Sequence, residues 1–76
     1  MPDKITSIPA RDLIKVFEKF GYKLDRRKGS HVMMTKSGSR TLVIQESNNV
    51  PVPHILANLR SANITRDEYL KALSEI

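Results

Sequence analysis

The stretch Tyr22 to Gln45, YKLDRRKGSHVMMTKSGSRTLVIQ, decides the fold of this chain. Three of its segments alternate between two sets of side chains, as half-buried strands do. The segments are Tyr22–Arg27, His31–Thr35 and Thr41–Gln45. Gly29-Ser30 and Lys36–Ser39, which separate them, have the composition of tight turns. The pattern therefore predicts a three-stranded antiparallel meander.

The alternation also predicts which face of this sheet is covered. Four apolar residues of the second and third segments fall on one face and need a covering layer. They are Val32, Met34, Leu42 and Ile44. His31 then falls on the opposite, uncovered face. In the first segment, Tyr22, Leu24 and Arg26 are expected on one side, and Lys23, Asp25 and Arg27 on the other.

A first helix is expected over Ala10–Phe20, before the strands. Its apolar residues recur at helical spacing and leave one stripe for the core. They are Ala10, Leu13, Ile14, Phe17 and Phe20. Gly21 fits the left-handed position that ends a helix. Arg11, Lys15 and Lys19 lie on the other side of this helix, either as a solubilising face or as an RNA contact.

Two more helices are expected after the strands. The first, over Pro53–Ala62, would bury Ile55, Leu56 and Leu59 and end at Asn63 in the left-handed conformation. Thr65 and Glu68 form a capping box, threonine followed three residues later by glutamate, which begins a helix over residues 66–74.

The order helix, three strands, helices predicts an α+β fold, α-β-β-β-α(α). All helices lie on one face of the three-stranded antiparallel sheet, as in the double-stranded-RNA-binding fold. The 76 residues are expected to form a single domain over 1–76, with residues 1–8 as a loose lead-in.

Charge and composition restrict the partners of this domain. The net charge of +5 is concentrated in residues 11–40, where nine Lys and Arg face three Asp and Glu. A basic half favours an anionic polymer as partner, although a solvated basic face is the alternative. The absence of cysteine excludes disulfides and thiolate metal sites, and the two histidines and scattered carboxylates show no metal-ligand spacing. We expect no metal and no cofactor.

The sequence also carries no sign of a membrane. No apolar run approaches the roughly 20 residues that span a bilayer, and residues 1–10 do not resemble a signal peptide. We therefore expect a cytoplasmic protein with no membrane partner.

Lys28-Gly29-Ser30-His31 is the candidate active site. His31 can donate and accept protons near neutral pH. Gly29 lets the backbone turn or approach a ligand closely, and Ser30 can donate a hydrogen bond to a phosphate oxygen. Arg26, Arg27 and Lys28 would bind phosphates, and Lys28 would also stabilise developing charge.

This group of residues predicts metal-free phosphodiester chemistry in which the 2′-hydroxyl of RNA is the nucleophile. DNA, which lacks that hydroxyl, is not expected as a partner. One histidine performs one proton transfer, so the group that performs the other stays open. His54, in the first turn of an expected helix, is interpreted as structural or solvent-exposed.

Several motifs together resemble the HicA, or YcfA-like, family of toxins over residues 9–73. These motifs are Leu13-Ile14, Phe20-Gly21-Tyr22, Arg26–Val32 and Asn63–Leu70. The resemblance implies a double-stranded-RNA-binding-like fold and an mRNA interferase toxin of a type II toxin–antitoxin pair. It implies ribosome-independent cleavage of mRNA, arrested growth, and inhibition by a cognate HicB-type antitoxin.

The resemblance also assigns the active-site histidine of the family to His31 and the glycine two residues earlier to Gly29. One segment departs from the family pattern. Many relatives have Pro-x-His where the third strand ends, whereas this chain reads Val43-Ile44-Gln45-Glu46-Ser47. A second histidine is therefore not available there.

Two other functions remain compatible with the sequence. The same basic half suits a non-catalytic RNA-binding module, which would bind RNA in a salt-sensitive way and leave it intact. It also suits a protein-interaction domain whose basic face binds an acidic partner.

Overall fold

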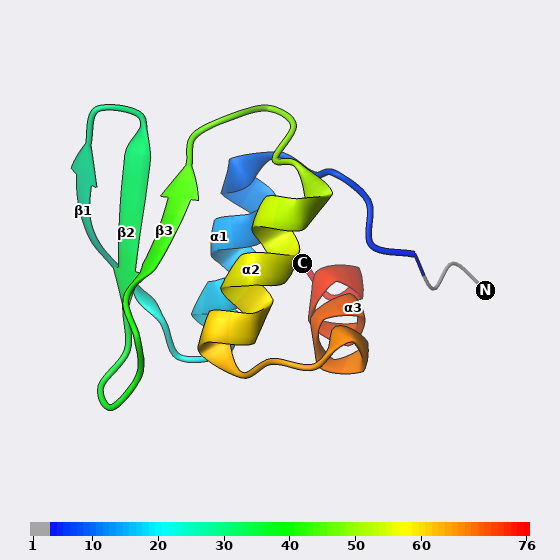
Figure 1. Ribbon diagram of the computed structural model, residues 1–76. Coiled ribbons are helices and arrows are strands. Elements are labelled where there is room, and N and C mark those ends of the chain that lie inside the picture. The colour runs from blue at the N-terminus through cyan, green and yellow to red at the C-terminus, as the bar shows by residue number, and fades with distance from the viewer. Residues whose placement is uncertain (1–3) are drawn as a thin grey trace.

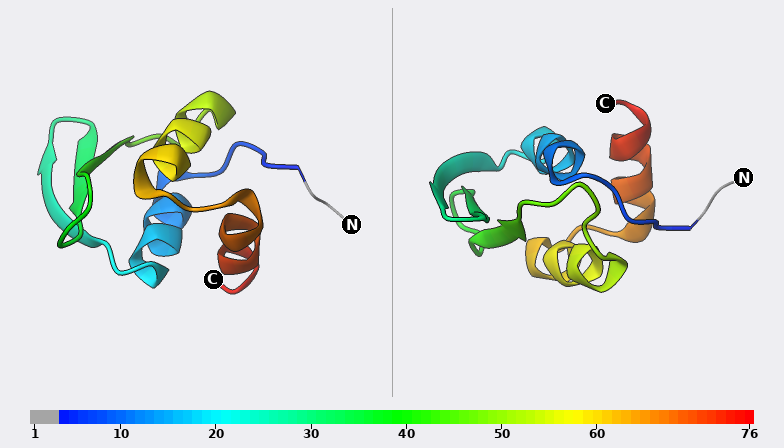
Figure 2. Two further views of the ribbon diagram at one scale, coloured as in Figure 1. Left: turned by 60° about the horizontal axis from the view of Figure 1, so that its bottom comes forward. Right: turned by 90° about the horizontal axis from the view of Figure 1, so that it is seen from above.

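The element order confirms the predicted α+β fold (Figure 1). The computed structural model describes residues 4–76. The elements are α1 (Ala10–Lys19), β1 (Lys23–Lys28), β2 (His31–Thr35), β3 (Leu42–Gln45), α2 (Val52–Ala62) and α3 (Arg66–Ser74). All three helices lie on the same side of the sheet, which leaves its other face uncovered (Figure 2). None of the helices within residues 4–76 has the length and apolarity needed to cross a membrane.

The sheet has the order β1-β2-β3, and both pairs of neighbouring strands are antiparallel. Val32 pairs with Ile44, and Met34 pairs with Leu42. Because directly opposite residues of an antiparallel pair share one face, these four side chains form a single apolar surface. All four are buried beneath the helices, as the alternation predicted.

The core joins that surface to the apolar stripe of α1. Leu13 and Phe17 are fully buried as predicted, and the ring of Phe17 packs edge-on against Tyr22 with centroids 5.9 Å apart. Ile14 and Phe20 are only partly buried, because the stripe turns toward Val16, which the sequence analysis did not include. Helices α1 and α2 end where the sequence predicted: Gly21 and Asn63, which follow them, both have the positive φ of a left-handed helix end.

The capping box that begins α3 is also confirmed. The Thr65 hydroxyl accepts from the Glu68 backbone at 3.1 Å, and the Glu68 carboxylate accepts from the Thr65 backbone at 2.8 Å. These hydrogen bonds to Thr65 favour the charged carboxylate and lower the pKa of Glu68.

In α2 the predicted buried set was partly wrong. Ile55 and Leu59 are buried, but Leu56 is 41% exposed and Asn58 is buried in its place. The Asn58 side-chain amide donates to the backbone oxygen of Val43 at 3.3 Å and to that of His54 at 3.2 Å. Asn58 therefore fixes α2 to the outer edge of β3 by donating to a carbonyl of that edge.

The N-terminal segment is held more closely than the expected loose lead-in. Ile5 and Ile8 pack against the core, and the Val50 backbone donates to the Ile8 oxygen at 2.8 Å. Residues 1–3 of that lead-in lie outside the described residues.

Tyr69 of α3 gives the fold a specific weakness at alkaline pH. Its side chain is fully buried, and burial raises the pKa of Tyr69 from 10.0 to about 12. Between these values the unfolded chain loses the phenolic proton while the native state retains it, so stability falls as pH rises. At about pH 11 the loss is about 1.4 kcal/mol.

We expect Tyr69→Phe to remove this loss, because phenylalanine has no proton to release. The Tyr69 hydroxyl has no hydrogen-bond partner within residues 4–76, so stability at neutral pH should change by less than about 1 kcal/mol. Urea unfolding of both proteins at neutral and alkaline pH measures the difference. An equal alkaline loss in wild type and variant would contradict the assignment to Tyr69.

Candidate active site

The site begins at the turn between β1 and β2. Gly29 has φ of +60°, whereas Ser30 does not have positive φ. Positive φ at only the first of two loop residues is the pattern of a type II′ hairpin turn, which favours glycine there. This turn places Lys28 and His31 directly opposite each other.

One row of side chains crosses the uncovered face at this end of the sheet. Lys28 pairs with His31, and His31 pairs with Gln45. All three are exposed, and the His31 ring makes no hydrogen bond to any of residues 4–76. His31 therefore lies between a lysine and a glutamine on an open surface, accessible to a large substrate.

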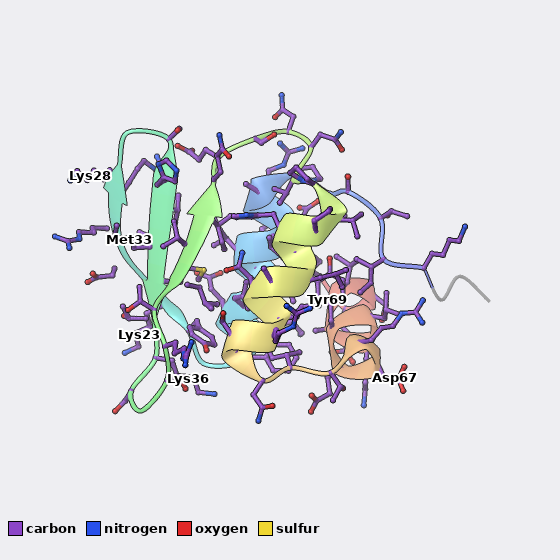
Figure 3. The ribbon with its side chains drawn as sticks, in the orientation of Figure 1. Lys23, Lys28, Met33, Lys36, Asp67 and Tyr69 are labelled. Atoms are coloured by element: carbon purple, nitrogen blue, oxygen red, sulfur yellow. The ribbon has the colours of Figure 1, made fainter. Side chains whose placement is uncertain are left out.

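A second row lies next to the first on the same face. Arg26 pairs with Met33, which pairs with Val43. Figure 3 shows Lys28 and Met33 projecting away from the helices. The Lys28 and Arg26 cations thus line one edge of the face, and Met33 and Val43 add a small apolar area at its centre. This surface suits an anionic polymer that also presents apolar rings.

The position of Arg26 corrects the strand pattern predicted from the sequence. The register shifts between Leu24 and Arg26, so that Asp25 forms a bulge in β1. An extra residue reverses the alternation beyond it. Arg26 therefore shares a face with His31 instead of with Leu24, which lies opposite the buried Met34.

Regular alternation beyond the bulge places Arg27 on the face opposite Arg26 and Lys28, and the bulge makes that face the helix side. Arg27 lies opposite the buried Val32, on the helix side of the sheet. Its guanidinium forms an ion pair with Glu46 at 3.3 Å. The structure thus brings Arg26, Lys28 and the Gly29-Ser30 turn together with His31, and directs Arg27 to the other side.

His54 does not belong to this site. Its Nε2 atom lies 3.2 Å from the backbone oxygen of Val43, which is the oxygen that also accepts from Asn58. Of the two predictions for His54, structural or solvent-exposed, this contact agrees with the structural one. His54 and Asn58 together satisfy a carbonyl on the free edge of β3.

Fold and site together define a class: a small two-layer α+β domain whose uncovered basic sheet face carries one exposed histidine. A sequence model of the HicA toxin family, described as HicA toxin of bacterial toxin-antitoxin, matches residues 10–64. Because this match spans more than half of the chain, the protein belongs to the HicA toxin family. A comparison with curated proteins gave no match.

The matched residues run from the start of α1 to the residue after Asn63, so they contain the whole candidate site. Membership in this family makes the protein a toxin of a toxin–antitoxin system, with a cognate antitoxin as partner. Helix α3 lies beyond the match, although Tyr69 completes the core.

Proposed function

We propose that this HicA-family toxin is an endoribonuclease that cleaves mRNA without a metal ion, with His31 as a general acid/base. The observation that carries this proposal is the exposed His31 ring in a row with Lys28, beside a glycine turn, on the uncovered basic face. Because the imidazole is exposed on an open face, a phosphodiester at any position of an RNA chain can reach it.

The chemistry requires two proton transfers. A base removes the proton of the 2′-hydroxyl, its oxygen attacks the adjacent phosphorus, and an acid protonates the departing 5′-oxygen. The products are a 2′,3′-cyclic phosphate and a 5′-hydroxyl. His31 performs one of these transfers, and water or another group performs the other.

The cations near His31 supply charge stabilisation. Lys28 lies directly opposite His31, so its ammonium can approach the phosphate at which His31 transfers a proton. Arg26, on the same face, binds a neighbouring phosphate. Arg27 contributes less than the sequence suggested, because Glu46 already neutralises its charge. Ser30 and the unhindered backbone at Gly29 complete the phosphate-binding turn.

The proposed mechanism also bears on the nucleic-acid substrate and on the antitoxin. DNA lacks the attacking hydroxyl, so the substrate is RNA. The family resemblance favours mRNA in the cytoplasm as that RNA. A HicB-type antitoxin inhibits by covering Lys28 and His31 with an acidic surface, which also stabilises the small domain because it binds only the folded state.

Incubation of the purified protein with mRNA in a chelator tests the proposal. We expect cleavage to proceed at the same rate with and without the chelator. RNA that is bound but left intact would instead favour the non-catalytic RNA-binding module. Cleavage that requires an added divalent metal would overturn the proposed mechanism.

A further inference from the structure

A cavity lies next to the candidate site, on the helix side of the sheet. Its volume is about 490 Å³, within the range of about 300–1,000 Å³ typical of ligand sites. Ala10 and Arg11 of α1 line it together with Glu46, Ser47 and Asn48, which follow β3. The β1–β2 turn, the end of β3 and the start of α1 all lie at this end of the molecule (Figure 1).

Backbone hydrogen bonds hold the walls of this cavity in place. The Ala10 backbone donates to the Ser47 oxygen at 2.8 Å, and the Glu46 backbone donates to the Ser30 oxygen at 2.6 Å. The Asn49 backbone donates to the Ser47 hydroxyl at 3.0 Å. The loop over residues 46–49 is therefore fixed both to α1 and to the Gly29-Ser30 turn. The cavity thus exists before a ligand binds.

Strand pairing brings one residue of the cavity close to His31. Glu46 directly follows Gln45, which pairs with His31 across β2 and β3. At Gly29, an added Cβ would meet no atom within 4 Å. The turn therefore leaves open space at Gly29 for a nucleotide chain that passes from His31 toward the cavity.

The polar groups of the cavity define the chemistry of its ligand. The Arg27 guanidinium orients the Glu46 carboxylate, which has acceptor capacity beyond that one ion pair. A carboxylate accepts a hydrogen bond from the amino group of cytosine but repels the carbonyl that uracil carries at the same position. Arg11 of α1 adds a cation to the lining of the cavity, and its charge suits a phosphate.

We propose that this cavity binds the nucleotide beside the scissile phosphate, and that Glu46 selects a base with an exocyclic amino group over uracil. Arg11 holds the phosphate of that nucleotide. The inference rests on the proposed function, because it takes RNA as the substrate, and it adds the residues that determine which RNA sequence is preferred.

Binding of two homopolymeric oligonucleotides of ten residues tests the inference. One contains only cytidine and the other only uridine, so the same base occupies the cavity in every register. Both carry 2′-fluoro sugars, which lack the nucleophile and keep the probes intact. We expect the protein to bind the cytidine probe about fivefold or more tightly by fluorescence anisotropy.

Three variants identify the residues responsible. Glu46→Gln should bring the ratio of the two affinities close to one, because an amide can accept from cytosine and donate to uracil. Arg11→Gln should weaken both probes equally. Lys15→Gln is the matched control, since Lys15 is an exposed cation one turn further along α1 and outside the cavity, and it should weaken binding less.

The outcomes separate this inference from the proposed function. No binding, equal affinities in the unmodified protein, or an unchanged ratio in Glu46→Gln would overturn the cavity assignment, even if the protein cleaves RNA. A cytidine preference that depends on Glu46 would support it, even if no RNA is cleaved and the proposed function fails.

Discussion

Replacement of His31 by alanine should lower the rate of RNA cleavage by about 10²–10⁴-fold, the contribution typical of a general acid or base. The side chain is exposed on the uncovered face, where it contributes little packing. Stability should therefore change by less than about 0.5 kcal/mol. RNA affinity should fall little, because Lys28 and Arg26 remain on the same face.

Single-turnover cleavage of a labelled RNA measures this loss, and thermal unfolding verifies that the variant is folded. His54→Ala provides the matched control. It removes the other histidine of the chain, whose Nε2 atom lies 3.2 Å from the Val43 oxygen and outside the row of Lys28, His31 and Gln45. The control should cleave at nearly the wild-type rate and lose about 0.5–1.5 kcal/mol of stability. A His31→Ala rate within tenfold of wild type would exclude His31 as the catalytic group.

Phe17→Ala should have the largest effect on stability, a loss of about 3–5 kcal/mol. Phe17 is fully buried between α1 and the sheet, and its ring contacts Tyr22 edge-on. A domain of this size has a total stability of roughly 4–11 kcal/mol. The variant should therefore lose a large share of its total stability.

Urea unfolding of Phe17→Ala beside Phe20→Ala measures how much of that loss depends on burial. Phe20 belongs to the same helix end but is only partly buried, so its loss should be clearly smaller. Equal losses in the two variants would show that α1 does not contact the sheet through the Phe17 face.

Local signals of the sequence were sufficient for most of the fold. Val32 and Ile44 are buried because period-two alternation in short strands specifies a face directly. Thr65, Gly21 and Asn63 mark helix ends because each satisfies backbone groups within a few residues of itself.

Long-range contacts explain what the sequence analysis missed. Asn58 is buried because its amide reaches a carbonyl of β3, a partner that lies 15 residues away in the chain. The bulge at Asp25 has no glycine or proline to mark it and becomes visible only in the pairing of β1 with β2. That bulge decides which cations share the face of His31, so the composition of the site required the structure.

The basic composition of residues 11–40 does not reveal that neighbouring cations have different surroundings. Arg26 and Arg27 are neighbours in sequence, but Arg26 lies on the uncovered face with His31, and Arg27 forms an ion pair with Glu46 on the opposite side. The Glu46 carboxylate, which forms the ion pair with Arg27, is also the group that we infer selects the base in the adjacent cavity.

Cleavage of an RNA that carries a single 2′-deoxynucleotide at the cut position, in a chelator, tests the central claim most directly. We predict that the all-ribose RNA is cut to a 2′,3′-cyclic phosphate and a 5′-hydroxyl, and that the substituted position stays intact. Cleavage at the 2′-deoxynucleotide, or products with a 5′-phosphate, would contradict a mechanism in which His31 assists attack by the 2′-hydroxyl.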